Sequence, residues 1–231
     1  AHADEIGFMV KQVDREGFVR FMPIGGFDPR TLLAQRVILH GQEDVKGVIT
    51  PKPNWIQRDG EQGKAMEIRD LVIDTGRSGE EVHRLVQMGD VISLAQRFEA
   101  LNDRVVMGRN FDDRVGVYAM LEAVRRVGEC RVDVYAVATV QEEVGIKGAI
   151  TSAYGLAPEL AIALDVTFAT QHDDEGPGTF ALGKGPTIAS GPNFHPQVVE
   201  RLKAAAKAEE IPYQHEPVPG GSGTDAWGIQ V

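Results

Sequence analysis

The chain has 231 residues, 42% of them hydrophobic and 25% charged, and this length allows one large domain or two small ones. Its net charge of −10 argues against non-specific binding to nucleic acid or to an anionic membrane, because both need basic patches. No apolar run approaches the roughly 20 residues of a membrane span, and no secretory signal is evident at the start. The single Cys130 excludes an internal disulfide, so a cytoplasmic protein is predicted.

The first half of the chain predicts a β-rich unit. One helix interrupts it, because Ser78 and Glu81 form a capping box ahead of apolar residues at helical spacing. His40 is expected in a loop. Short strands at such spacing predict a small barrel or sandwich. The β-like runs cover residues 8–13, 17–21, 36–39, 45–49 and 71–74, and a hairpin turn is expected at 14–17.

From about residue 109 helical and strand patterns alternate, which predicts a doubly wound α/β layer structure. Ligands of such sheets bind outside the carboxyl ends of the strands. The expected elements are helices over 115–127, from about 145, and over 196–210, and strands over 132–140 and 160–164. Both ends of the chain are abrupt, so we expect it to be cut from a longer protein.

Two adjacent carboxylates, Glu142 and Glu143, follow the predicted strand 132–140. Such a pair at a strand end is costly unless a cation meets it. A metal bound by one carboxylate and a proton carried by the other would explain both residues. A solvated pair that opens the next helix is the alternative interpretation.

Three other segment ends carry similar residues. His2 has Asp4 two positions later, Asp112 precedes the helix 115–127, and Asp165 ends the strand 160–164. Each has an ordinary explanation when taken alone, such as helix capping by Asp112 or Asp113. Taken together, the residues suit a pair of zinc-like ions bridged by one aspartate, with a further carboxylate to move the proton. The proposed ligands are His2, Asp112, Glu143 and Asp165, and the proton carrier is Glu142.

Five ordered runs extend these observations over nearly the whole chain: HADEIGFMV, NFDDRVGVY, QEEVGIKGA, ALDVT and GGSGTDA. They resemble the co-catalytic metallo-aminopeptidases of the TET/glutamyl-aminopeptidase family. The resemblance implies an α/β/α metallopeptidase catalytic domain with an inserted β-rich, barrel or PDZ-like, dimerisation domain. By that resemblance residues 1–7 begin the catalytic domain, 8–108 form the insert, and 109–231 continue the catalytic domain, whose carboxyl-terminal part is missing.

The resemblance also implies two divalent ions per subunit, zinc or cobalt. One ion would take His2, Asp112 and Asp165. The other would take Asp112, Glu143 and a second histidine, so Asp112 would bridge the ions, and a cis peptide bond would follow it. Glu142 would be the general base, and Asp4 would support His2.

The resemblance further implies that the glycine-rich loop 220–225 lies beside the substrate, with Gly221, Thr224 and Asp225 as candidate contacts. A plain flexible turn is the alternative reading of that loop. The second histidine is expected beyond Val231, because His172, His195 and His215 do not sit at its motif position. His195 is expected to cap the helix that starts at Pro196, and His215 to lie in a strand or loop. His172, in the loop after Asp165, is the nearest substitute within this chain.

The function implied is removal of N-terminal residues from peptides, through a two-metal-activated water and a glutamate base. Self-association into dimers and a tetrahedral dodecamer is implied as well. A related two-metal deacylase or carboxypeptidase is the alternative enzyme, and a catalytically degenerate scaffold is the non-enzymatic alternative. The side-chain preference of the enzyme does not follow from the sequence.

Overall fold

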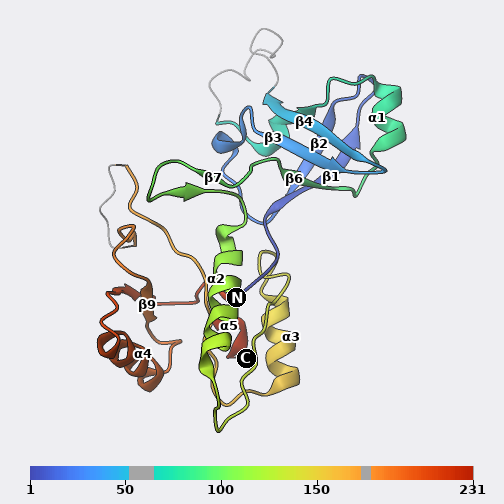
Figure 1. Cartoon of the computed structure of the whole chain (residues 1–231). Helices are drawn as coiled ribbons and strands as arrows, with labels where there is room; N and C mark the ends of the chain where they lie inside the picture. Colours follow the sequence, from blue (N-terminus) through green and yellow to red (C-terminus); the bar gives the residue numbers. More distant parts are fainter. Residues whose placement is uncertain (52–64, 173–177, 231) are drawn as a thin grey trace. The chain divides into compact units, whose positions relative to one another are not determined.

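A computed structural model describes residues 1–51, 65–172 and 178–230. The chain divides into two compact units (Figure 1). One unit is Glu5–Asn110, and the other combines Ala1–Asp4 with Phe111–Val231. The first unit therefore interrupts the second in the sequence. In the described part of the chain, no helix has the length and apolar character needed to cross a membrane.

The unit Glu5–Asn110 contains a closed barrel of six antiparallel strands, as the short β-like runs predict (Figure 1). The strands are neighbours in the order β1-β2-β5-β4-β3-β6, and β6 closes the barrel on β1. Their bounds are β1 (Gly7–Val13), β2 (Val19–Ile24), β3 (Arg36–His40), β4 (Asp44–Pro51), β5 (Leu71–Asp74) and β6 (Val91–Leu94).

Alternate side chains of these strands fill the barrel. In β4, Val45 and Ile49 are fully buried, and the residues between them alternate between buried and exposed. A Cβ at Gly47 would lie 2.4 Å from Ile73 Cγ2, so the glycine lets β4 and β5 pack closely. The largest fully buried side chains of the core are Phe8, Leu32, Leu39, Ile49, Leu71 and Ile73. Each such side chain stabilises the fold by about 1.5–3 kcal/mol.

Helix α1 (Gly79–Leu85) covers part of this core, and its predicted capping box is confirmed. The Ser78 hydroxyl accepts from the Glu81 amide, and the Glu81 carboxylate accepts from the Ser78 amide. Val82 is fully buried against the barrel core. The short elements of this unit are η1 (Pro29–Leu32), η3 (Ile68–Asp70) and the hairpin of β7 (Glu99–Ala100) and β8 (Val106–Met107).

The expectation of a loop at His40 is wrong. His40 ends β3, because β4 and β6 both pair with this strand as far as that residue. Its Nδ1 lies 2.8 Å from Asp44 Oδ1, and its Nε2 lies 2.8 Å from Ser93 Oγ. The imidazole thus links three neighbouring strands on the outside of the barrel.

The second unit is mainly helical in the residues described. Helix α4 packs against a parallel pair of strands, and α5 packs against α3. A Cβ at Gly228 in α5 would lie 2.8 Å from Ile146 Cγ2, so the small residue permits this close contact. The elements are α2 (Phe111–Val127), α3 (Lys147–Leu156), β9 (Thr187–Ser190), α4 (Pro196–Ala208), β10 (Gln214–Pro217) and α5 (Asp225–Ile229).

The strands predicted at 132–140 and 160–164 are not formed. Within the described residues only Thr139 pairs there, in a single bridge to His2. The apolar side chains of both segments are exposed, at 70% for Val132, 61% for Tyr135 and 53% for Ile162. A strand needs a neighbour along its length to pair its backbone groups, and apart from the bridge at Thr139 the described chain supplies none for these two segments. The layered α/β arrangement expected from the sequence is therefore seen only in part.

Candidate metal centre

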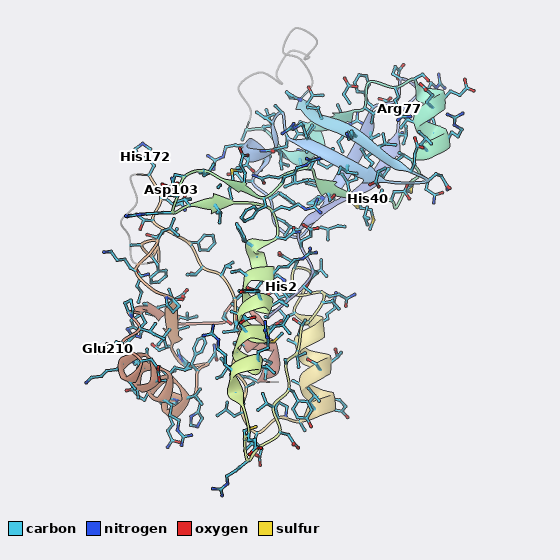
Figure 2. All side chains as sticks on the ribbon, viewed as in Figure 1. His2, His40, Arg77, Asp103, His172 and Glu210 are labelled. Carbon is cyan, nitrogen blue, oxygen red and sulfur yellow. The ribbon has the colours of Figure 1, made fainter. Side chains whose placement is uncertain are left out.

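The candidate site is built around the imidazole of His2 (labelled in Figure 2), whose side chain is 1% exposed. A parallel bridge to Thr139 fixes its backbone. The Ala3 amide donates to the Thr139 carbonyl at 2.9 Å, and the Thr139 amide donates to the Ala1 carbonyl at 3.0 Å. The histidine is thus held by main-chain bonds on both sides before any side chain contacts it.

Asp113 holds the same histidine from the start of α2. Its side chain is fully buried and accepts from the His2 amide at 3.2 Å and from the Gly116 amide at 3.1 Å. A Cβ at Gly116 would lie 2.3 Å from Asp113 Oδ1, so the glycine makes room for this carboxylate. The peptide bond between Asp112 and Asp113 is cis, as the resemblance predicts. Sequence reasoning treated Asp113 only as a helix cap and missed its contact with His2.

Three carboxylates face the Nε2 atom of His2. Asp112 Oδ1 lies at 2.9 Å, Asp165 Oδ1 at 3.8 Å and Glu142 Oε2 at 3.9 Å. His2, Asp112 and Asp165 can each offer one ligand atom, and these three atoms all lie within 4.8 Å of one another. Residues from three distant parts of the sequence therefore converge on one point.

A tight turn brings Glu142 to this point. Gln141 has a positive φ of 63°, and the amides of Gly145 and Ile146 both donate to the Glu142 carbonyl. Asp4 secures the turn, because its carboxylate accepts from the amides of Glu142 at 3.2 Å and Glu143 at 3.4 Å. Asp4 Oδ1 also lies 3.4 Å from His2 Nδ1, so one carboxylate contacts both the imidazole and the turn.

The packing of carboxylates changes their proton affinities. Burial, reinforced by the nearby charge of Asp165 and opposed by His2, raises the pKa of Glu142 to about 7. Burial raises the pKa of Asp165 to about 6, with Asp112 among the charges that add to the effect. Burial, followed by the charge of Asp112, also raises the pKa of Glu143. A cation among these groups would offset the repulsion between them.

The pKa of His2 is raised in spite of its burial. Burial alone disfavours the imidazolium and is the largest single effect. The charges of four carboxylates outweigh it together, in the order Asp165, Glu142, Asp112 and Asp4. Positive charge at the position of His2 Nε2 is therefore favourable, whether a proton or a metal ion carries it.

The other predicted residues lie around this cluster. Glu143 is half-buried and lies outside the group of three ligand atoms. Gly221 lies beside the Trp227 ring, and the Thr224 hydroxyl caps α5 by accepting from the Ala226 amide. Asp225 is 2% exposed, so its carboxylate is not open to a substrate. Its role as a substrate contact, expected from the resemblance, does not fit this burial.

Among the described residues, the candidate metal group contains no histidine other than His2. His195 takes the N-cap position of α4, as the sequence predicts, and makes no side-chain capping bond. His215 lies in β10, with its Nε2 2.5 Å from Ser190 Oγ. The chemistry of the group fits a divalent cation, because one imidazole nitrogen and carboxylate oxygens are the usual ligands of zinc-like ions.

Comparison with known proteins decides the family. A family model described as M42 glutamyl aminopeptidase matches residues 1–231. The chain belongs to the M42 aminopeptidase family. It is therefore a metallo-aminopeptidase, an enzyme that hydrolyses peptides.

Individual M42 relatives agree with this assignment. The lysyl aminopeptidase of Pyrococcus furiosus is 39% identical over 235 residues, which cover 100% of this chain and 68% of the relative. The TET aminopeptidase of Thaumarchaeota archaeon SCGC AB-539-E09 has a TM-score of 0.89 and is 36% identical, covering 99% of this chain and 68% of that one. The mixed α/β fold with its six-stranded barrel is thus that of TET aminopeptidases.

A third M42 relative bears on assembly. The TET1 peptidase of Pyrococcus horikoshii has a TM-score of 0.79 and is 32% identical, covering 100% of this chain and 70% of that one. That protein can assemble into a tetrahedron or a large octahedral shell. A structure of PhTET1-12s, 31% identical with a TM-score of 0.81, is a dodecamer.

Proposed function

We propose that this M42 enzyme removes N-terminal residues from peptides with His2, Asp112 and Asp165 as metal ligands and Glu142 as general base. The observation that carries the proposal is the convergence of those three ligand atoms within 4.8 Å of one another. Glu142 supports it, because a carboxyl with a pKa of about 7 is suited to exchange protons at neutral pH.

A second divalent ion is part of the proposal. Asp112 would bridge the two ions, and Glu143 would bind the second together with a further histidine. Zinc and cobalt both suit such ligands. When bound, the ions would polarise the scissile carbonyl and make a water more acidic. Asp4 would support this centre by holding the imidazole of His2 and the turn at Glu142 and Glu143.

The chain's own residues then move one proton. Glu142 accepts it at its carboxylate from the water that attacks the first peptide carbonyl, and delivers it to the nitrogen of the leaving peptide. The carboxylate is only 8% exposed, so bulk water competes little for this proton. Gly221 and Thr224, in the loop before α5, are the proposed contacts for the substrate backbone.

We propose further that the barrel unit mediates self-association and that dimers build a tetrahedral dodecamer. The dimerisation domain would comprise residues 8–108. The α/β/α catalytic domain would comprise residues 1–7 together with residues 109–231. The assemblies of the TET1 relatives support this proposal. Light scattering after size-exclusion chromatography would test it, and a monomer at micromolar concentration would contradict it.

The proposed mechanism predicts that Glu142→Gln loses hydrolysis but keeps its metal. We expect a loss of about 10²–10⁴-fold in kcat on aminoacyl p-nitroanilides, because the base is removed, with an unchanged zinc content. Glu159→Gln, at an exposed position, is the matched control and should keep full activity.

Two other results of this experiment would count against the proposal. Full activity of Glu142→Gln would exclude its role as base. Cleavage of substrates with an acetylated amino terminus would favour the two-metal deacylase instead, because an aminopeptidase needs the free amine.

Chelation should abolish the wild-type activity, and zinc or cobalt should restore it.

A further inference from the structure

A buried hydroxyl–carboxylate pair lies behind the candidate metal centre. Thr139 is 7% exposed and Asp225 is 2% exposed, and Thr139 Oγ1 donates to Asp225 Oδ2 at 2.6 Å. Asp225 Oδ1 is also buried, and it makes no hydrogen bond to any described residue. A buried carboxylate with one unpaired oxygen destabilises a fold, so its presence calls for a reason other than stability.

The Thr139 hydroxyl donates its hydrogen bond to the Asp225 carboxylate. Thr139 Oγ1 lies 3.1 Å from the Ala1 carbonyl and 2.6 Å from Asp225, but a hydroxyl has a single proton to donate. The shorter, charge-assisted bond is the stronger of the two. Asp225 therefore determines the rotamer of Thr139.

Thr139 in turn determines the position of His2. Its amide and carbonyl make both main-chain bonds of the bridge that flanks the histidine. The Asp225 carboxylate is thus linked to the histidine segment through Thr139.

The same pair connects the histidine to the base. Thr139 lies three residues before Glu142, and the Val140 carbonyl between them accepts from the Gly148 amide of α3. Asp225 opens α5, which packs against α3. One side-chain pair therefore joins the segment of His2, the turn of Glu142 and the glycine-rich loop that precedes α5.

We infer that Asp225 and Thr139 are positioning residues of the metal centre, which hold His2 and the Glu142 turn at the separation that a metal ion requires. This inference rests on the proposed role of His2 as a ligand. It also changes the expected role of Asp225, from a contact of the substrate to a support of the ligand shell. Removing such a support lowers metal affinity by about 10- to 100-fold in comparable sites.

The test is zinc affinity, measured on this chain by competition with a chromogenic chelator. We expect Thr139→Val, which keeps the shape and removes the hydroxyl, to bind zinc about 10- to 100-fold more weakly. Thr139→Ser keeps the hydroxyl and should bind like the wild type. Asp225→Asn should lose affinity by a smaller factor, because a neutral acceptor makes the weaker hydrogen bond.

Two controls separate positioning from general damage. Thr151→Val removes a hydroxyl that bonds only to carbonyls within α3, and should leave zinc affinity unchanged. The thermal unfolding of each metal-free variant should match the wild type within a few degrees. A structural defect would instead lower stability and affect the valine and serine variants alike.

The outcomes distinguish this inference from the proposed function. If His2→Ala binds zinc like the wild type, the ligand set itself is wrong. If His2→Ala loses zinc but Thr139→Val binds within twofold of the wild type, the ligand set holds and the positioning role is overturned. Equal losses for the valine and serine variants would overturn it too. If Thr139→Val fails to fold, an unchanged zinc affinity of Asp225→Asn would overturn the positioning role.

Discussion

Gly148 marks where helix α3 approaches the turn that carries Glu142. A Cβ at this position would lie 2.3 Å from the Val140 carbonyl oxygen and 2.7 Å from its nitrogen. Gly155, on the same helix, has nothing within 4 Å of the corresponding position. The two glycines therefore offer a matched comparison within one element.

We predict opposite effects of alanine at these positions. Gly148→Ala should lower the free energy of unfolding by about 1–3 kcal/mol, because rigid backbone atoms must move. Gly155→Ala should raise it by up to about 1 kcal/mol, because alanine favours the helix. Urea denaturation followed by circular dichroism would measure both, and a neutral Gly148→Ala would contradict the close approach.

At the residue scale, the sequence could indicate the acidic and histidine residues of the centre but not their supports. His2, Asp112 and Asp165 stand at segment ends, where side chains of this type signal a shared ligand. Thr139 carries no such signal, because a threonine within an apolar run looks like an ordinary strand residue. Only the distance from Thr139 to Asp225, 86 positions later, reveals its contact.

Helix α1 provides a prediction at the scale of one element. Its first turn depends on the reciprocal bonds between Ser78 and Glu81. Ser78→Ala should destabilise the helix by about 1 kcal/mol, and the α1 amides should exchange with solvent several-fold faster. Ser78→Asp keeps an acceptor at the cap and should exchange as the wild type does. Unchanged exchange in the alanine variant would show that packing of Val82 alone holds the helix.

The elements of the barrel could be predicted, whereas two strands of the other unit could not. Alternating burial, as in β4, requires apolar residues at every second position, and this pattern is visible in the sequence. The capping box predicts the start of α1. The apolar runs 132–140 and 160–164 have the composition of buried strands. Composition cannot supply the neighbouring strand, however, and apart from the bridge between Thr139 and His2 the described residues leave both runs unpaired.

The charge of the whole metal centre predicts how stability depends on pH. The pKa values of Glu142, at about 7, and Asp165, at about 6, are raised, and that of His2 is raised too. The metal-free folded protein therefore binds more protons than the unfolded chain between about pH 4 and pH 7. Its free energy of unfolding should fall as the pH rises through this range, because each unit of a raised pKa is worth about 1.4 kcal/mol.

Melting temperatures at pH 5.5 and pH 8, with and without chelator, would test this. The chelated protein should melt at a higher temperature at pH 5.5 than at pH 8. Zinc at 100 times its Kd should add about 2.7 kcal/mol at pH 8. Glu142→Gln should show a weaker pH dependence in chelator. A chelated wild type that gains stability toward pH 8 would contradict the raised pKa values.

The interruption of one unit by the other also has a consequence for synthesis. The whole barrel unit, Glu5–Asn110, leaves the ribosome before Thr139, the residue that pairs with His2. At about 5–20 residues per second this delay is of the order of seconds. His2 is thus translated before the barrel but can meet Thr139 only after the barrel has been synthesised. The nascent chain must keep an imidazole and its neighbours unpaired while a complete barrel folds between them.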